Sequence, residues 1–395
     1  MMRLSKQLAR QLCALAFFSG APHAEMNWQQ HWQLEAESGF SQASTSPLFA
    51  SQNQTFNDMA LRWFPQTNQW QAQLVALKQN QQTQLRVAEL FWSGEVKGKN
   101  LLIGKQRLNL GVGYGFRPLD IFSPYQRNPI AIQVEQGLAV VSLSQFSDAD
   151  ELSLFYTDAY LSHDSAAFAQ RGIGIRNYRL TGHQEWQGLA YVDNQRGLNL
   201  GGSWITTLGD AWELHAESRY QQYYSQMMSR LDFPPLDRQA AIIEQQFANA
   251  WQTLFGMTWT NLVGDNLIIE YWFDNRALSL RQWRAVTQLS RDLQVLGSQF
   301  DPLRLSQAAV FQGNNLVQHN LLLHWHRDLT DWQPALDLLF SPSDGGLIST
   351  AKINYEFSQG WTLGAQLRYL GGKNDAVYQL LPERYIGLIK LEARF

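Results

Sequence analysis

Residues 346–370 read GLISTAKINYEFSQGWTLGAQLRYL, and they contain the pattern that decides the fold. Apolar or small residues alternate with polar ones over 347–357, and the same alternation returns over 361–369. The connector between them, 358–360, is only three residues long and ends in glycine. A period of two predicts β-strands that have one apolar and one polar face, joined here as a hairpin.

This period dominates the chain after residue 31 and divides it into eighteen segments. They are 32–43, 54–65, 70–79, 84–94, 100–110, 132–146, 151–158, 168–180, 184–194, 198–208, 211–221, 250–262, 266–276, 317–328, 332–341, 346–357, 361–370 and 385–395. Sixteen strands also fit, because the segments around 54–94 and 132–180 alternate less regularly. Segments of about ten residues with one apolar face suit tilted strands that cross a bilayer.

Composition favours a membrane barrel over a soluble sandwich. Only 16% of the residues are charged, against about 25% in soluble domains. Hydrophobic residues make up 45% and aromatic residues 13%. Mean hydropathy is −0.31, and no apolar run of about 18 residues follows the N-terminus, which excludes a helical membrane protein. Lys and Arg total 31 against 34 Asp and Glu, without a basic run, which argues against nucleic-acid binding.

The connectors between segments are short on one side and mostly long on the other. The short ones include 181–183, 208–210, 263–265, 329–331 and 358–360, and the long ones lie near 112–132, 222–248, 276–316 and 371–384. A tryptophan follows a short connector at Trp70, Trp186, Trp212, Trp332 and Trp361. Outer-membrane barrels have short periplasmic turns and aromatic residues at the interfaces, so we expect these tryptophans to form a ring at one end.

The N-terminus has the features of a secretory signal peptide, which we place at 1–24. Three basic residues precede the apolar stretch 12–18, and small residues follow it. A buried N-terminal helix is the alternative. Export of the chain predicts a location in the bacterial cell envelope.

The last segment, 385–395, carries apolar or small residues at every second position and ends in Phe395. It resembles the C-terminal signature of Gram-negative outer-membrane β-barrel proteins of the porin-like kind. The resemblance implies location in the outer membrane, contact with lipid and lipopolysaccharide, and reading of this strand by the barrel-insertion machinery.

We therefore expect an all-β fold, a single antiparallel transmembrane β-barrel of about 18 strands over 25–395. Long loops are expected near 112–131, 222–248 and 276–316. Barrels of this size leave an aqueous channel. Within the last loop, apolar residues over 278–309 recur at helical spacing, which predicts either a short helix or an ordinary surface loop.

The loop 111–129 is rich in glycine at its start and contains prolines later, so it either folds into the barrel as a constriction or serves a purely structural role. Gly104-Lys105-Gln106-Arg107, with Gly111 and 117–120, resembles a stretch of the alginate-exporter-like porin group. That resemblance implies an 18-stranded channel with an arginine-rich lumen for an anionic polysaccharide. The sequence departs from the exporter pattern at Val112-Gly113-Tyr114.

Charged residues on the strands are expected to face the lumen, because a charge on the lipid face costs ~2–4 kcal/mol near the bilayer midplane. As constriction residues we expect Lys105, Arg107, Arg117, Asp120 and Arg127. As further lumen charges we expect Arg62, Glu89, Glu217, Arg219, Glu270, Arg276, Lys352 and Arg368. The mixed signs fit either ion-pair ladders or a transverse field that selects small polar solutes.

His324 and His326 lie on one face of a segment, and His215 lies on another segment. Two histidines at this spacing suit a metal only if a carboxylate lies nearby, so we expect lumen or interface residues and no metal or cofactor. No local motif indicates a catalytic group. The sequence therefore predicts a passive channel for a hydrophilic solute or exported polymer. One alternative is a surface barrel enzyme, a lipid or peptide hydrolase that uses the histidines. The other is an adhesion or assembly scaffold that presents loops 222–248 and 276–316 to partners.

Overall fold

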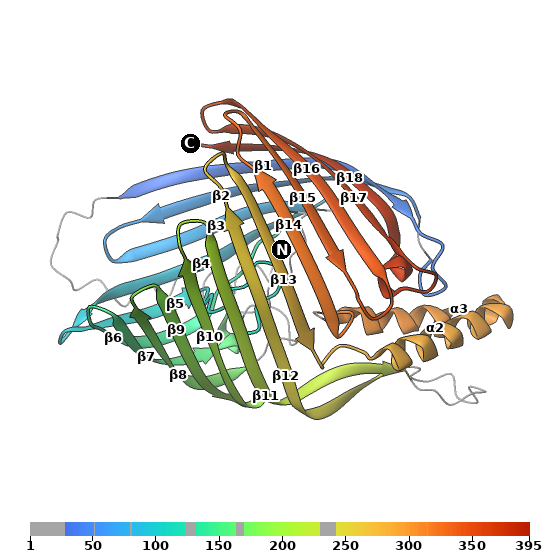
Figure 1. The fold of residues 1–395 in the computed structure, drawn as a ribbon, viewed down its shortest axis with the longest axis horizontal. Helices are drawn as coiled ribbons and strands as arrows, with labels where there is room; N and C mark the ends of the chain where they lie inside the picture. The colour runs from blue at the N-terminus through green and yellow to red at the C-terminus, as the bar shows by residue number, and fades with distance from the viewer. Residues whose placement is uncertain are drawn as a thin grey trace, which may run out of the picture.

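The computed structural model describes residues 28–50, 52–79, 81–122, 132–162, 170–229, 242–313 and 315–395. These residues form one closed, antiparallel, 18-stranded sheet (Figure 1). The predicted fold class and the count of eighteen strands are confirmed. The expected signal peptide, at 1–24, lies outside the described residues.

All eighteen predicted segments are strands. The first nine are β1 (Gln29–Ala43), β2 (Gln54–Gln66), β3 (Trp70–Gln79), β4 (Gln82–Val96), β5 (Lys99–Gln106), β6 (Leu138–Phe146), β7 (Asp150–Asp158), β8 (Arg171–Thr181) and β9 (Gln184–Asp193). The others are β10 (Gly197–Leu208), β11 (Trp212–Ser229), β12 (Ile242–Thr260), β13 (Asp265–Asp274), β14 (His319–Arg327), β15 (Trp332–Phe340), β16 (Gly346–Ser358), β17 (Trp361–Gly372) and β18 (Glu383–Arg394).

Two strands are shorter than predicted and two are longer. The segment 100–110 ends as a strand at Gln106, because the next backbone N–H, of Arg107, donates to the Glu89 side chain. The segment 132–146 becomes a strand only at Leu138, after a stretch that bonds to other side chains.

By contrast, β11 and β12 continue pairing far beyond the predicted segments 211–221 and 250–262, as far as Ser229 opposite Ile242. In this extension apolar and polar residues no longer alternate, so the strands are recognised there only from their pairing. The loop predicted at 222–248 therefore consists of strand up to 229 and from 242, and its middle, 230–241, lies outside the described residues.

Each strand pairs with its neighbours in sequence, and β1 pairs with both β2 and β18. The closing seam runs from Gln33 opposite Arg394 to Ala43 opposite Glu383. Phe395 continues the seam, since its backbone N–H donates to the Trp32 carbonyl at 3.0 Å. Closure leaves no unpaired strand edge in the sheet, as a membrane requires.

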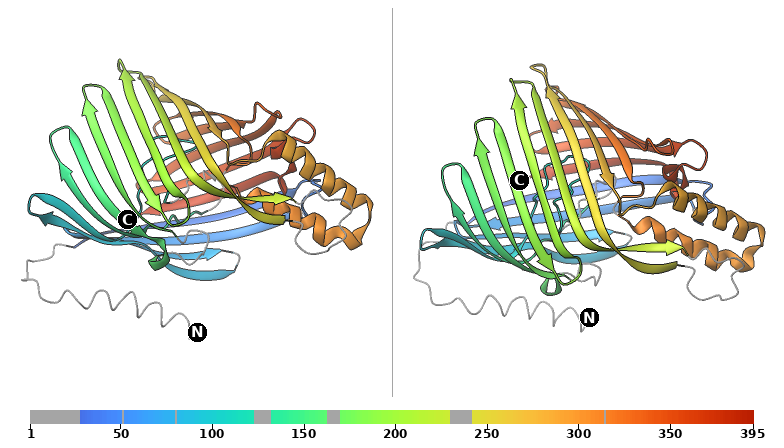
Figure 2. Two further views of the ribbon diagram at one scale, coloured as in Figure 1. Left: turned by 90° about the horizontal axis from the view of Figure 1, so that it is seen from below. Right: turned by 60° about the horizontal axis from the view of Figure 1, so that its bottom comes forward.

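The connections after the even-numbered strands β2 to β16 are two to four residues long and all lie at one end of the barrel. Trp70, Trp212, Trp332 and Trp361 each begin a strand at this end, and Trp186 lies two residues into β9. The predicted aromatic ring at the short-turn end is thus confirmed. The longer connections lie at the opposite end, where Figures 1 and 2 show helices α2 (Leu280–Val295) and α3 (Asp301–Ser306) beyond the strands.

The polarity of the barrel is the reverse of that of a soluble protein. Outward residues such as Leu154 and Ile175 are 52% and 45% exposed, whereas inward residues such as Glu217, Arg219 and Glu270 are buried. An apolar exterior around a polar interior is stable only where lipid surrounds it.

This polarity makes a prediction about Ile175, which pairs with Leu154 near the middle of β7 and β8. Arginine at position 175 should destabilise the folded barrel by ~2–4 kcal/mol, because the guanidinium would enter the lipid. Ile175→Ala, which shortens the side chain without adding charge, is the matched control. Reversible unfolding in phospholipid vesicles measures both, and equal stability of the two variants would contradict a lipid-facing Ile175.

The segment 278–309 contains helices α2 and α3. Of the two structures predicted for it, a short helix or an ordinary surface loop, the helix is therefore correct. Ser279 caps α2, accepting from the backbone of Gln282, whose side chain accepts in return from the Ser279 backbone. Trp283 and Val286 of α2 pack with Leu48 and with Tyr378 at the rim of the barrel. Among the described residues, no helix is long and apolar enough to span a membrane.

Candidate functional site

A segment of the β5–β6 connection, residues 107–122, crosses the interior of the barrel, and we call it the constriction segment. It leaves the wall at β5, and its residue Tyr114 reaches β14, nine positions away in the order of eighteen strands. The Tyr114 hydroxyl lies 3.0 Å from His324 Nε2, and the two rings are 4.4 Å apart. Since β5 and β14 are opposite each other, the segment spans the lumen.

Two wall carboxylates hold this segment by its backbone. Glu217 on β11 accepts hydrogen bonds from the N–H groups of Val112, Gly113 (2.9 Å) and Leu119 (3.0 Å). Glu270 on β13 accepts from the N–H groups of Tyr114, at 2.6 Å, and Gly115, at 2.7 Å. Hydrogen bonds to a charged acceptor are worth about 1.5–3 kcal/mol each, so the two carboxylates supply the main polar attachment of the segment.

The glycines at the start of the loop allow its backbone to pack closely against neighbouring atoms. A Cβ on Gly113 would lie 2.0 Å from the Phe116 carbonyl oxygen, and one on Gly115 would lie 2.5 Å from Leu322 Cδ2. Neither glycine has a positive φ. Their role is therefore to leave space for the backbone to approach the carboxylates and the wall.

Apolar side chains anchor the segment at two places. Phe116 packs among Leu254, Trp272 and Leu322, on β12, β13 and β14. Further along, the apolar residues Leu119, Ile121 and Phe122 pack against the wall of β4 to β9. The segment is thus fixed on both sides of the lumen.

Asp120 closes a turn within the segment. Its carboxylate accepts from the N–H groups of Leu110 and Gly111, both at 2.7 Å, and lies 3.6 Å from Arg117. Burial raises the pKa of Asp120, and these partners oppose that shift. Because the pKa of Asp120 is raised in the folded segment, protonation of this carboxyl at low pH favours the folded turn over an unfolded segment.

The other arm of the connection, 132–137, follows the wall of β1 to β4. The Ile132 N–H donates to Glu37 at 2.9 Å, and Arg62 donates to the Gln133 carbonyl at 3.1 Å. The Ile132 side chain packs with Val75 and its neighbours. The two arms together narrow the interior from both sides.

The interior charges pair with one another. Glu35 bridges Arg62 and Lys390, the latter at 2.5 Å. Asp337 bridges Lys352, at 3.0 Å, and His324, at 2.6 Å. These contacts are ion pairs of the kind expected for an ion-pair ladder, one of the two arrangements that the mixed signs leave open.

The predicted constriction residues are placed differently from one another. Arg117 and Asp120 lie together in the constriction segment, and Arg107 lies at its start, paired with Glu89 at 2.9 Å. Lys105 lies two residues after the exposed Ile103, on the same face of β5. Its Nζ donates to Gln136 Oε1, in the arm 132–137, at 3.0 Å. Arg127 falls outside the described residues.

The remaining predicted lumen charges occupy four positions. Glu217 and Glu270 hold the constriction segment, whereas Arg368 donates to Thr350 at 3.0 Å. Arg219 lies behind the segment and donates to the Pro118 carbonyl at 3.3 Å, and Arg276 lies at the long-loop mouth.

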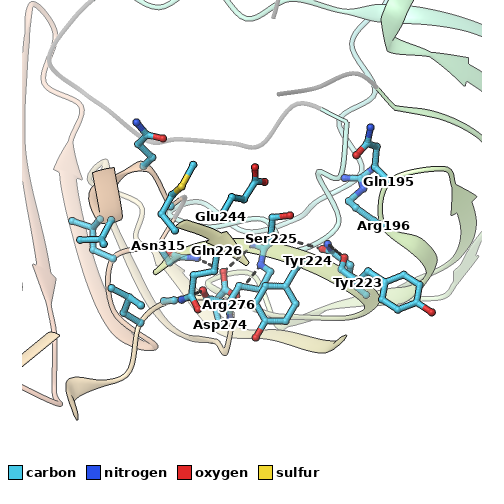
Figure 3. Close-up of a pocket in the computed structure, with 18 of the residues that line it drawn as sticks. Gln195, Arg196, Tyr223, Tyr224, Ser225, Gln226, Glu244, Asp274, Arg276 and Asn315 are labelled. Carbon is cyan, nitrogen blue, oxygen red and sulfur yellow. Dashed lines mark hydrogen bonds and ion pairs between the residues drawn. The ribbon is translucent and has the colours of Figure 1, made fainter. Parts of the chain in front are cut away.

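A cavity of about 400 Å³ opens at this mouth. Figure 3 shows Gln195 and Arg196 on one side, Glu244 and Asn315 on the other, and Ser225 between them. Two ion pairs border it: Arg276 lies 2.9 Å from Asp274, and Arg196 lies 2.8 Å from Asp193. Ile121, at the end of the constriction segment, also lines it, so the cavity lies directly before the crossing.

The sequence analysis missed two parts of this site. Asp193 and Arg196 flank a short turn, and their spacing of three residues was the available signal. Asp337 stands among apolar residues on β15, which was the signal for an inward carboxylate. Among the described residues, no group of three or more His, Cys, Asp or Glu side chains is arranged to hold a metal ion.

Solved structures of the same fold are outer-membrane porins. The chain is similar to OccAB1 of Acinetobacter baumannii, with a TM-score of 0.60, 8% identity, and 95% of this chain and 99% of that chain covered. It is also similar to OccK8 (OprE) of Pseudomonas aeruginosa, with a TM-score of 0.57, 8% identity, and coverage of 94% and 99%. For OccK11 (OpdR) of Pseudomonas aeruginosa the TM-score is 0.54 at 8% identity, with 93% and 96% covered.

No family model and no curated protein sequence matches the chain. The likeness in fold confirms the predicted porin-like barrel. The shared fold and the apolar exterior agree with the expected location in the bacterial outer membrane, in contact with its lipids.

Proposed function

We propose that this chain is a passive channel for hydrophilic solutes, and that the constriction segment sets its selectivity. The observation that carries the proposal is the constriction segment, which is fixed across the lumen by both walls. The interior is in contact with water, since the side chains of Arg117 and Lys390 are each 27% exposed. A barrel of 18 strands is wide enough for an aqueous channel.

A small solute fits the interior better than an anionic polymer. The resemblance to the exporters implies an arginine-rich lumen, but the interior arginines here have acidic partners, such as Glu35 for Arg62 and Glu89 for Arg107. The solved structures of this fold also favour a channel over a surface enzyme. We further propose that β18, with the terminal Phe395, is the strand read by the insertion machinery.

Conductance and ion selectivity in a planar bilayer test this function. The wild-type barrel should show a steady conductance, and Arg107→Ala/Arg117→Ala should shift the reversal potential toward cation selectivity, because two positive charges leave the narrow region. Arg179→Ala is the control, since Arg179 is exposed on β8 and pairs with Asp150.

A silent barrel that is inserted and folded would contradict the channel. Conductance with an unchanged reversal potential in the double variant would keep the channel and remove these two arginines from its selectivity.

A further inference from the structure

The charged groups around the mouth cavity cancel one another. Arg196 and Arg276 line it on the positive side, and Asp274 and Glu244 on the negative side. Arg276 is bonded to Asp274 through two nitrogens, at 3.0 and 2.9 Å. Asp274 compensates Arg276, and Asp193 compensates Arg196 at 2.8 Å, so the two arginines of the cavity attract an anion only weakly.

Amides and hydroxyls supply most of the other polar groups. Those that line the cavity are Gln170, Gln195, Gln221, Gln226, Gln312, Asn315, Tyr223, Tyr224 and Ser225. An amide or a hydroxyl offers both a donor and an acceptor, whereas a carboxylate or phosphate ligand needs donors alone. Groups of both kinds match a ligand whose own groups both donate and accept, and alcohol hydroxyls do this.

Aromatic rings complete the lining. Tyr223 is 39% exposed, and Tyr224 stacks on Phe247 with ring centroids 5.5 Å apart. Consecutive strand residues point to opposite faces, so one tyrosine ring faces the cavity. A ring among amides provides apolar surface for the C–H face of a ligand ring and polar groups for its edge, a combination typical of small-molecule sites. At about 400 Å³, the cavity also falls within the range of such sites.

We propose that this cavity binds an uncharged, polyhydroxylated solute, a sugar or a short neutral oligosaccharide, before it passes the constriction segment. The proposal rests on the proposed channel and names its substrate class. The compensated arginines argue against anionic substrates, and the mixture of amides, hydroxyls and tyrosines argues for alcohol groups. The position of the cavity beside Ile121 makes it the last binding place before the crossing.

The test is interruption of the ionic current by sugars in a planar bilayer. Maltose should cause concentration-dependent interruptions in the wild-type channel at lower concentrations than gluconate or lysine. Tyr223→Ala and, independently, Gln195→Leu should each weaken the apparent maltose affinity by about tenfold, as expected for one lost contact. Tyr220→Ala is the matched control on the same strand, because Tyr220 packs on the exposed Trp251 and does not line the cavity.

The salt current separates the two proposals. A steady current in potassium chloride without interruption by maltose, or with stronger interruption by gluconate, would overturn the sugar site and leave the channel standing. The sugar site would also fail if the Tyr220 control lost affinity as much as Tyr223→Ala and Gln195→Leu. Absence of current in the inserted wild-type barrel would overturn the channel itself.

Discussion

Alanine at both Glu217 and Glu270 should release the constriction segment and raise the single-channel conductance by roughly twofold or more, since an 18-stranded barrel without an inward segment is wide open. The two carboxylates accept five backbone N–H groups from 112–115 and 119. Loss of one carboxylate alone should give a smaller increase and a noisier current.

Glu392→Ala is the control for this experiment. Glu392 lies on β18, where its partners include Arg394 at 2.7 Å and Gln33 at 3.0 Å. Its replacement should leave the conductance unchanged. If the double variant conducts like the wild type while remaining folded, the carboxylates do not hold the segment, and the apolar contacts of Phe116 must be sufficient.

A methyl group at position 113 should have the second-largest effect. Gly113→Ala places a Cβ 2.0 Å from the Phe116 carbonyl oxygen, which is backbone and cannot rotate away. The segment must then leave the wall near Glu217 and lose its hydrogen bonds there. We expect increased conductance, increased current noise and a lower unfolding temperature, by several degrees, as typical for losses of 1–3 kcal/mol from overpacking.

Gly188→Ala is the matched control, because a Cβ at Gly188 meets nothing within 4 Å and its φ is not positive. The conductance and unfolding temperature of both variants can be measured in the same vesicle preparations. Equal behaviour of the two would show that the segment tolerates displacement at Gly113, contrary to the packing described above.

The strands were predictable because lipid and water act on alternate residues. Every second residue of β16 and β17 must suit lipid, and this requirement is local in the sequence. The extension of β11 and β12 was not predictable, because beyond the membrane no such requirement applies and polar residues occupy both faces. There, pairing such as that of Tyr223 with Ala248 is determined only by the partner strand.

For the site, the pattern predicted which face a charge occupies but not what it binds. Glu217 and Glu270 were correctly expected to face inward, where their partners are backbone N–H groups about 100 to 156 residues away. Every residue except proline has a backbone N–H, so the sequence does not show which of them will donate to a given carboxylate. The mouth cavity escaped prediction because its amides come from four separate parts of the chain, 170, 195, 221–226 and 312–315.

The long crossing from β5 to β14 also determines the order of assembly. The constriction segment is made of residues 107–122, but the carboxylates and the apolar residues that hold it on the far side of the lumen come from β11 to β14. Contacts so distant in sequence form late because their loop closure is costly. A growing sheet that has reached only β10 offers this segment no opposite wall. The barrel must therefore be nearly complete before its narrow region exists, and a stalled assembly intermediate would be an unobstructed hole in the membrane.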